Sequence, residues 1–319
     1  MISKNRIGKV TTYCVIVVIL LSFFEKHDHL GLLQVQATPS SNSEISNIQY
    51  GNALHVPLDS GLDKFGVKKI YETKIDGREW YVNMEEPRAD PWFIAGDAEL
   101  EKRPDNSWRV GGIDSNEQFN DKYHIIIGVN TPPGKEQWRD VEITGYFKIV
   151  SASDDDEEEV GLQWYARGAN HTESEPCQGT SLKGRLLIDG TANWKKEIWH
   201  DGGYTDARAT EQASDNSFID KWIGWKVIMY NTQEDNAVKM ESYLDEDNNN
   251  DWKQVTSLVD SGDWFARSSD EKFFSADCGL PKDYVVTNSG QVAAFRSDGI
   301  IWDFRDLSVR EIQPLLTKR

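Results

Sequence analysis

The stretch RDVEITGYFKIV, residues 139–150, alternates apolar and polar side chains at every second position. Val141, Ile143, Phe147 and Ile149 fall on one side of an extended chain, with Gly145 among them. Successive side chains of a β-strand point to opposite faces of the sheet, so the stretch predicts a strand with one buried and one polar face. The acidic run that follows, residues 154–159, predicts a solvated hairpin tip.

The same period of two recurs along the chain, and no long stretch carries the apolar stripe of an amphipathic helix. Further strands are expected at residues 160–167, 185–189, 194–200, 224–231, 237–245, 252–259, 291–297 and 300–312. Turn residues such as Gly, Asn and Asp separate them. Many short alternating strands without crossover helices predict an all-β fold, an antiparallel two-sheet jelly-roll β-sandwich.

The N-terminus predicts export. Lys4, Arg6 and Lys9 precede an apolar run of residues 13–24, which is too short to span a membrane because a span needs about 20 apolar residues. A small-residue cleavage site ends at Ala37, so residues 1–37 are expected to be a signal peptide or, alternatively, an uncleaved N-terminal anchor. Residues 38–52 predict a disordered lead-in, and residues 53–319 a single jelly-roll domain.

Charge and cysteine usage agree with a secreted or cell-surface protein. The net charge of -18 disfavours nucleic acid and, apart from the N-terminal anchor, membranes as partners. Of the three cysteines, Cys14 lies in the signal segment. Cys177 and Cys278 are therefore expected to form a disulfide rather than a metal site or a catalytic pair.

Residues 193–208, NWKKEIWHDGGYTDAR, gather sugar-stacking, cationic and proton-transferring side chains around a Gly-Gly break. This mixture suits a polysaccharide ligand. If the strand continues to residue 200, alternation puts four side chains on one face: Trp194, Lys196, Ile198 and His200. The opposite face would carry Lys195, Glu197 and Trp199.

Four strands each place a tyrosine beside polar groups on one face: Glu142/Tyr146/Lys148, Gln163/Tyr165/Arg167, Lys226/Tyr230 and Lys239/Glu241/Tyr243. If these strands share a sheet, its outer face is a tyrosine-lined surface for sugar. The alternative is that tyrosine is simply a good strand former. The candidate substrate-binding residues are Tyr146, Tyr165, Lys196, Tyr230, Glu241 and Tyr243.

Three segments resemble the last half of concanavalin A-like lectin/glucanase jelly rolls: GWKVIMYN, AVKMESYLDEDNNNDWKQV and QVAAFRSDGIIWDFRDLSVREI. The similarity is a fold-level pattern over residues 60–314. It implies glycan binding on a concave sheet, because the superfamily includes lectins, laminarinase-type hydrolases and alginate- or glucuronan-lyase-type enzymes. Such an analogy raises the expectation of a sugar ligand without deciding the chemistry.

The residues favour a lyase over a hydrolase if the protein is an enzyme. Laminarinase-type enzymes resemble one another in an E-x-D-x-x-E strand, which this chain lacks. β-Elimination needs a carboxylate neutraliser, a base and an acid. The candidates are Gln163, Arg167 and Arg185 as neutralisers, His200 as base, and Tyr204 as base or acid. The R-x-E-x-R, Q-[IV]-H and Y-x-K-x-G-x-Y-x-Q signatures of alginate-lyase-type enzymes are incomplete.

The run DEDNNND offers the only metal prediction. Asp245, Asp247, Asn249 and Asp251 supply oxygen ligands at alternate positions, like the first part of a calcium loop. The Gly and the bidentate Glu of such a loop are missing, which favours a polar hairpin tip as the alternative. No cofactor other than Ca²⁺ is expected.

Three hypotheses follow: a glycan-binding jelly roll, a lyase of uronic-acid polymers, and a structural cell-surface protein. The spatial arrangement of His200, Tyr204, Arg185 and Gln163 discriminates among them. Convergence in one groove favours the lyase, and scatter leaves binding alone.

Overall fold

The computed structural model describes residues 61–113, 119–120, 124–132, 134–153, 160–169, 171, 174–232 and 234–314. All of them belong to one compact unit, His55–Arg319. The expected signal segment and lead-in lie outside the described residues. Within the described ranges, no helix has the length and apolar character that a membrane crossing requires.

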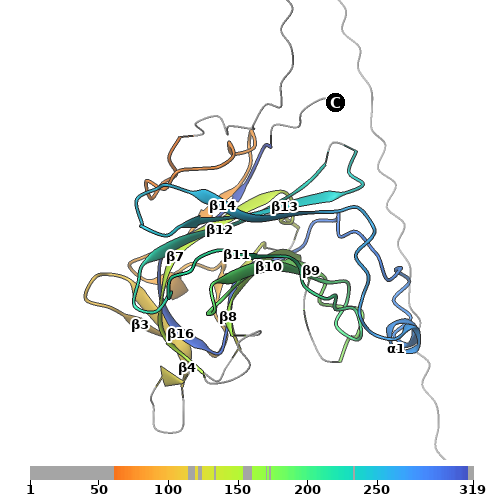
Figure 1. Cartoon of the computed structure of the whole chain (residues 1–319). Coiled ribbons are helices and arrows are strands. Elements are labelled where there is room, and N and C mark those ends of the chain that lie inside the picture. Colours follow the sequence, from red (N-terminus) through yellow and green to blue (C-terminus); the bar gives the residue numbers. More distant parts are fainter. Residues whose placement is uncertain are drawn as a thin grey trace, which may run out of the picture. The chain divides into compact units, whose positions relative to one another are not determined.

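Two antiparallel sheets make up the fold (Figure 1). The nine-stranded sheet contains, in spatial order, β14 (Lys253–Asp260), β13 (Val238–Asp245), β12 (Ile223–Asn231), β7 (Val141–Ala152), β16 (Ile300–Glu311), β4 (Trp108–Ile113) and β3 (Glu99–Lys102). Outside this order, β1 (Glu79–Tyr81) pairs with β16, and β5 (Phe119–Asn120) pairs with β4. The predicted two-sheet jelly-roll sandwich is confirmed.

The second sheet has seven strands in the order β11 (Arg208–Gln212), β10 (Thr191–Glu197), β9 (Ser181–Leu187), β8 (Gly161–Gly168), β15 (Val292–Asp298), β6 (His124–Asn130) and β2 (Phe93–Ile94). Helical structure in the described ranges is short: a 3-10 turn at Pro87–Ala89 and the helix α1 (Asp270–Ser275). β15 and β16 lie in different sheets, and Gly299 between them has a positive φ of 65°, which favours glycine at this crossing.

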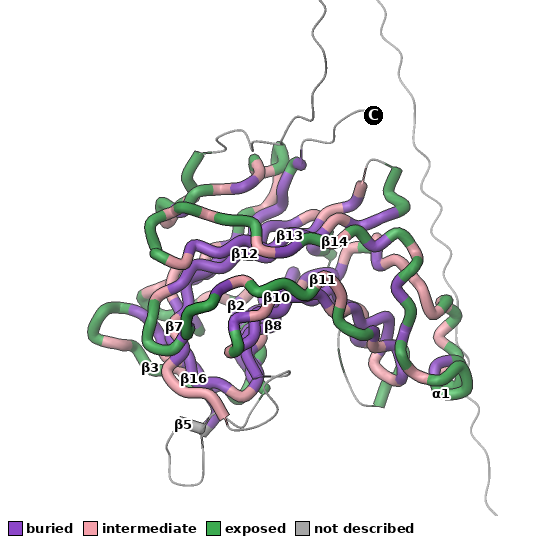
Figure 2. The backbone as a smooth tube through the Cα atoms, viewed as in Figure 1, coloured by how far each residue is buried: buried purple, intermediate pink, exposed green. Residues whose placement is uncertain are grey.

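The core lies between the two sheets, where the strands are mostly buried (Figure 2). The rings of Trp164 on β8 and Trp225 on β12 join the sheets, with centroids 4.5 Å apart. Phe295 on β15 packs edge-on against Trp164 at 4.9 Å. Buried aromatic rings contribute a large apolar area each, so the abundant tryptophans are mainly a packing device.

Strand prediction succeeds where alternation is regular. β7 buries Val141, Ile143, Phe147 and Ile149, as the period of two requires. The strand predicted at residues 194–200 is wrong at its C-terminal end, because β10 stops at Glu197. Six strands between residues 79 and 130 have no counterpart in the sequence analysis, nor do β11 and α1.

Candidate functional site

A row of polar side chains crosses four neighbouring strands on the outer face of the seven-stranded sheet. Gln163 on β8 lies opposite Arg296 on β15 and opposite Arg185 on β9. Arg185 lies opposite Asn193 on β10 and donates from Nη1 to Asn193 Oδ1 at 3.4 Å. Asp298 forms an ion pair with Arg296, with 2.7 Å between Asp298 Oδ1 and Arg296 Nη2. Guanidinium and amide groups in this arrangement suit carboxylates and hydroxyls.

A second row lies two residues further along the same strands, roughly 6.6 Å away. It joins Tyr165, Lys183 and Lys195 across β8, β9 and β10. Lys183 Nζ donates to Glu197 Oε2 at 2.6 Å. Burial lowers the pKa of Lys183, while the negative charge of Glu197 acts in the opposite direction. The cationic face therefore continues toward the end of β10.

Two histidines, a carboxylate and a phenol meet at that end. His171 Nε2 lies 3.5 Å from Glu197 Oε1 and 3.4 Å from the Tyr204 hydroxyl. His200 Nδ1 lies 3.2 Å from the same hydroxyl, and the two imidazole centroids are 4.0 Å apart. Burial, and after it the charge of Glu197, raise the pKa of the Tyr204 hydroxyl. Tyr204 therefore keeps its proton at neutral pH.

The Gly-Gly turn brings Tyr204 back to the end of β10. Tyr204 pairs with Glu197 through an isolated antiparallel bridge. Gly202 has a φ of 80°, which favours glycine. A Cβ on Gly203 would collide with the backbone of Trp199, so this position also requires glycine. The local sequence thus makes the return that positions the phenol.

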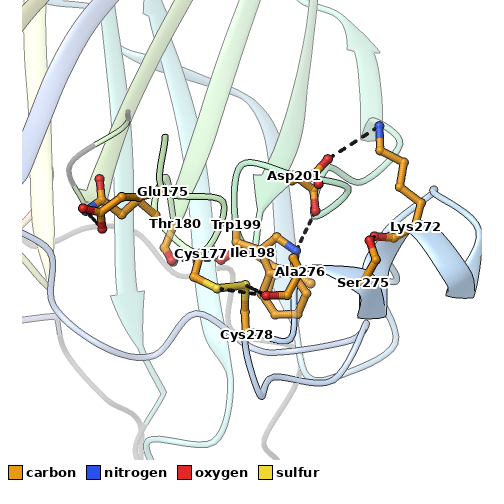
Figure 3. Close-up of a disulfide and its surroundings, with 11 residues drawn as sticks. Glu175, Cys177, Thr180, Ile198, Trp199, Asp201, Lys272, Ser275, Ala276 and Cys278 are labelled. Atoms are coloured by element: carbon orange, nitrogen blue, oxygen red, sulfur yellow. Dashed lines mark hydrogen bonds and ion pairs between the residues drawn. A yellow bond between two sulfur atoms is a disulfide. The ribbon is translucent and has the colours of Figure 1, made fainter. Parts of the chain in front are cut away.

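A disulfide fastens the loops around this cluster. Cys177 and Cys278 are bonded, as the cysteine count predicts, with 5.3 Å between their Cα atoms (Figure 3). Asp201 donates its backbone N–H to Pro176 O at 3.3 Å, which joins the loop before Cys177 to the turn after His200.

The helix α1 forms the other wall. Phe273 of α1 stacks on Trp199, with ring centroids 4.0 Å apart. Lys272 Nζ lies 3.8 Å from Asp201 Oδ1, across the turn drawn in Figure 3. A cleft of about 1010 Å³ opens between these elements. Its polar lining includes His200, Asp201, Tyr204, Asp206, Arg267 and Lys272.

Lys196 does not act beside His200, which corrects the shared face predicted for them. Lys196 points into the core, where its Nζ donates to Asp260 Oδ2 at 2.7 Å and to Tyr284 O at 2.8 Å. Both side chains of the ion pair are 0% exposed. The prediction of Lys196 as a substrate-binding residue is wrong because no ligand reaches it.

Arg167 is also absent from the site. It has a φ of 59° and is fully buried. Its Nη1 donates to Asn231 Oδ1 and to Val286 O, both at 2.6 Å, and its Nη2 to Asp140 Oδ1 at 3.2 Å. The guanidinium is used up in buried hydrogen bonds within the protein, so its predicted role as a neutraliser of a substrate carboxylate is wrong.

The four tyrosine-bearing strands do not share a sheet. β8, with Tyr165, belongs to the seven-stranded sheet, whereas the strands of Tyr146, Tyr230 and Tyr243 belong to the nine-stranded sheet. The tyrosine-lined single face is therefore a wrong expectation.

In the nine-stranded sheet the phenols bind carboxylates of the protein. Tyr243 donates to Glu241 Oε2 at 3.2 Å, and Tyr71 donates to the same oxygen at 2.8 Å. Tyr146 donates to Asp245 Oδ2 at 2.8 Å. Tyr146, Glu241 and Tyr243 are buried within these hydrogen bonds, and Tyr230 is half-buried beside them; their contact with sugar stays a prediction.

The DEDNNND segment forms a hairpin tip between β13 and β14. Asp245 accepts the backbone N–H groups of Asn249 and Asn250, both at 2.9 Å. Among the described residues, the acidic and histidine side chains close enough together to hold a metal ion are His171, Glu197 and His200. Asp245, Asp247 and Asp251 do not form such a group. Calcium at Asp245, Asp247, Asn249 and Asp251 stays a prediction, and the hydrogen bonding favours the hairpin tip.

Of the five predicted catalytic residues, His200 and Tyr204 meet. Gln163 and Arg185 lie on the same sheet face, in the row furthest from Glu197. Lys183 is not among the predicted site residues, although it shares the alternation of SLKGRLL with Arg185. Glu197 is predicted on the face opposite His200 because the predicted strand continues to residue 200, past the end of β10. Nothing in the local sequence indicates His171.

No family model matches the chain, and no curated protein sequence matches it. Solved structures of similar architecture include arcelin-5, a lectin-like defence protein from Phaseolus vulgaris, at 7% identity and a TM-score of 0.41, covering 74% of this chain and 99% of that one. A galectin-like protein of unknown function from Bacillus subtilis gives 12% identity and a TM-score of 0.43, covering 75% and 100%.

The exoplasmic/lumenal domain of VIP36 in its Ca²⁺/Man-bound form gives 11% identity and a TM-score of 0.44, covering 74% of this chain and 91% of that one. Arcelin-5 is described as lectin-like, and the Bacillus subtilis protein has a galectin-like fold. The strand pairing itself defines the fold of this chain, and neither ligand nor activity is carried over from them. None of the three is named as a lyase, so the lyase resemblance stays a prediction.

Proposed function

We propose that the protein binds an acidic polysaccharide on the outer face of the seven-stranded sheet. The observation that carries the proposal is the strand register. It aligns four cationic side chains on this face, Arg296, Arg185, Lys183 and Lys195, against the two carboxylates Glu197 and Asp298. In a chain of net charge -18, a local excess of positive charge is what a polyanion requires.

The partly exposed members make the direct contacts. Tyr165, Lys195 and Arg296 are half-buried on the sheet, as are His200 and Tyr204 at its end. Arg185 and Lys183 are 3% and 6% exposed, and contribute mainly through their charge beneath the ligand. The ring of Tyr165 offers an apolar face on which a sugar ring stacks.

Binding is tested with acidic and neutral polysaccharides by affinity electrophoresis and calorimetry. We expect the double change Lys195→Gln and Arg296→Gln to weaken binding of a uronic-acid polymer on the order of tenfold or more, because each charged hydrogen bond contributes about 1.5–3 kcal/mol. Affinity should also fall with added salt.

The matched control is Lys239→Gln with Lys253→Gln, which removes the same charge from the nine-stranded sheet. An equal loss in the control would show a non-specific charge effect. No binding to any polymer would leave the structural cell-surface protein as the better hypothesis.

The proposal includes export, with residues 1–37 as a signal peptide or anchor. The disulfide of Cys177 and Cys278 supports it, because such bonds persist in oxidising compartments. The protein is then secreted or held at the cell surface, where it meets polysaccharides.

A second candidate function is a polysaccharide lyase, favoured by the 3.2 Å contact of His200 Nδ1 with the Tyr204 hydroxyl. Neutral His200 would take the C5 proton of a uronic acid. The electron pair of the C5–H bond would form the C4–C5 double bond as the C4–O bond breaks, and Tyr204 would protonate the leaving oxygen. Lys183, with Nζ 5.1 Å from the Tyr204 ring centroid, would offset the substrate carboxylate.

Elimination creates an unsaturated uronate that absorbs ultraviolet light, so activity is followed by absorbance. Tyr204→Phe should lower the rate roughly 100-fold or more, a much larger loss than the loss in polymer binding, because proton transfer of this kind contributes 10²- to 10⁴-fold. Tyr230→Phe on the other sheet is the control. Absence of unsaturated product from every uronic-acid polymer, with binding intact, would leave the protein a lectin.

A further inference from the structure

The cluster at the end of β10 has the composition of a transition-metal site. One ligand atom each from His171, Glu197 and His200 can be chosen so that all lie within 4.8 Å of one another. Two imidazoles and one carboxylate are a known ligand set for zinc with a fourth position left open. Calcium and magnesium prefer oxygen ligands throughout, so the histidines favour zinc.

Three of the distances between these polar atoms match the edges of a tetrahedral zinc site. Zinc bonds of about 2.0–2.1 Å to nitrogen and oxygen place neighbouring ligand atoms about 3.3 Å apart. His171 Nε2 lies 3.5 Å from Glu197 Oε1 and 3.4 Å from the Tyr204 hydroxyl, and His200 Nδ1 lies 3.2 Å from that hydroxyl. The phenol therefore stands at the fourth corner, as a neutral donor that a ligand can displace.

Glu197 supplies a second, independent observation. The residue is 2% exposed, and its Oε1 has no close hydrogen-bond partner among the described residues: His171 Nε2 lies 3.5 Å away, and the Tyr204 hydroxyl is its other polar neighbour. Its other oxygen, Oε2, accepts from Lys183 Nζ at 2.6 Å and from Ser181 Oγ at 3.4 Å. A buried carboxylate oxygen is costly to leave unpaired. Lys183 and Ser181 thus orient the carboxylate so that Oε1 faces His171. In metal sites, hydrogen bonds of this kind hold a ligating side chain in position.

Gly179 keeps the space open. A Cβ at this position would collide with Glu197 Oε1 and stand 3.0 Å from His171 Cδ2. Its φ of 94° also favours glycine. His200 is held from the same segment, because its backbone N–H donates to Gln178 O at 2.7 Å. The loop that the disulfide anchors thus shapes the cluster on two sides.

We propose that His171 Nε2, Glu197 Oε1 and His200 Nδ1 bind a zinc ion, with the Tyr204 hydroxyl at the fourth corner. The site does not depend on glycan binding by the sheet. A neutral imidazole has one basic lone pair, so zinc on His200 removes the base that the elimination needs. Zinc is accordingly an inhibitor of any lyase activity.

The test uses untagged, disulfide-bonded protein that has been stripped with a chelator. Calorimetric titration with zinc should show one strong site per chain, and substitution with Co²⁺ should give the visible absorption of a tetrahedral centre. His171→Ala and Glu197→Gln should each weaken zinc binding by more than roughly 10-fold. Loss of a residue that only hydrogen-bonds to a metal ligand already weakens metal binding about 10- to 100-fold. His124→Ala is the matched control, because His124 lies on β6 and is exposed.

Wild-type protein that binds neither zinc nor Co²⁺ would overturn the proposal, and that measurement needs no variant to fold. Zinc binding that survives unchanged in folded His171→Ala and Glu197→Gln would also overturn it. Polymer binding measured on the same stripped protein is independent of both results, so failure of the metal site and failure of the glycan site are distinguishable.

Discussion

At the scale of single residues, Lys196 and Glu197 show how one step along a strand changes a side chain's use. Lys196 points into the core and pairs with Asp260 at 2.7 Å. Glu197 points outward and pairs with Lys183 at 2.6 Å. Both ion pairs are buried, and breaking such a pair by removing one partner typically costs about 3–5 kcal/mol. Truncating either residue is therefore expected to destabilise the fold, so the stability of such a variant must be measured before its function is compared with the wild type.

The buried carboxyl of Glu142 makes the free energy of unfolding depend on pH. Its Oε1 lies 2.8 Å from Lys226 Nζ, and its Oε2 lies 2.8 Å from Arg310 Nη2. Burial alone would raise the pKa of this carboxyl, but the two cations outweigh burial and lower the pKa from 4.5 to about 2. Between these values the unfolded chain holds a proton that the folded chain does not. The free energy of unfolding therefore falls as the pH drops from 4.5 toward 2, and this contribution is complete above 4.5.

We expect Glu142→Gln to lower the free energy of unfolding by roughly 3–5 kcal/mol at pH 6, because Lys226 and Arg310 lose their shared partner. Urea unfolding at several pH values should also show a smaller loss on acidification than the wild type. Glu211→Gln, an exposed change on β11, is the control. Equal acid sensitivity of wild type and Glu142→Gln would contradict the assignment.

At the scale of elements, the candidate site is built from connections rather than from strand centres. The end of β10, the Gly-Gly turn and α1 meet at the cleft, and the stack of Trp199 on Phe273 joins them. In Figure 1, α1 lies beside the end of the sheet where β9 begins and β10 ends. Loops positioned by a rigid sheet are where functional residues concentrate.

The disulfide carries a prediction about these elements. Cys177 and Cys278 are 101 residues apart, and a loop of about 100 residues is worth about 4.7 kcal/mol in the chain-entropy model. The double change Cys177→Ser and Cys278→Ser should lower the free energy of unfolding by roughly that amount, as measured by urea denaturation. Reductant should destabilise the wild type and leave the double variant unchanged. A wild type that is indifferent to reductant would refute the prediction.

At the scale of the whole molecule, charge is unevenly distributed. The chain carries 53 acidic and 35 basic side chains, but the outer face of the seven-stranded sheet gathers cations in register. On the nine-stranded sheet, Lys226 and Arg310 share one buried carboxylate, that of Glu142. Composition alone could not distinguish the two faces, because both alternate polar and apolar residues.

The residues alone predict the all-β class, the disulfide and most strands from residue 141 onward, apart from β11 and the C-terminal end of β10. These follow from local rules: a side-chain period of two, and two cysteines in a chain expected to be exported. Residues 79–130 escaped the same reasoning because their strands include several of only two to four residues, too short to show a period.

Strand register and sheet membership fix which polar residues lie together. Strand register placed Gln163 beside Arg185, and sheet membership separated Tyr165 from the other tyrosines. The end of β10 at Glu197 decided that His200 turns toward His171 rather than toward Lys196. Such contacts join residues far apart in the chain, and local periodicity contains no information about which strand lies beside which.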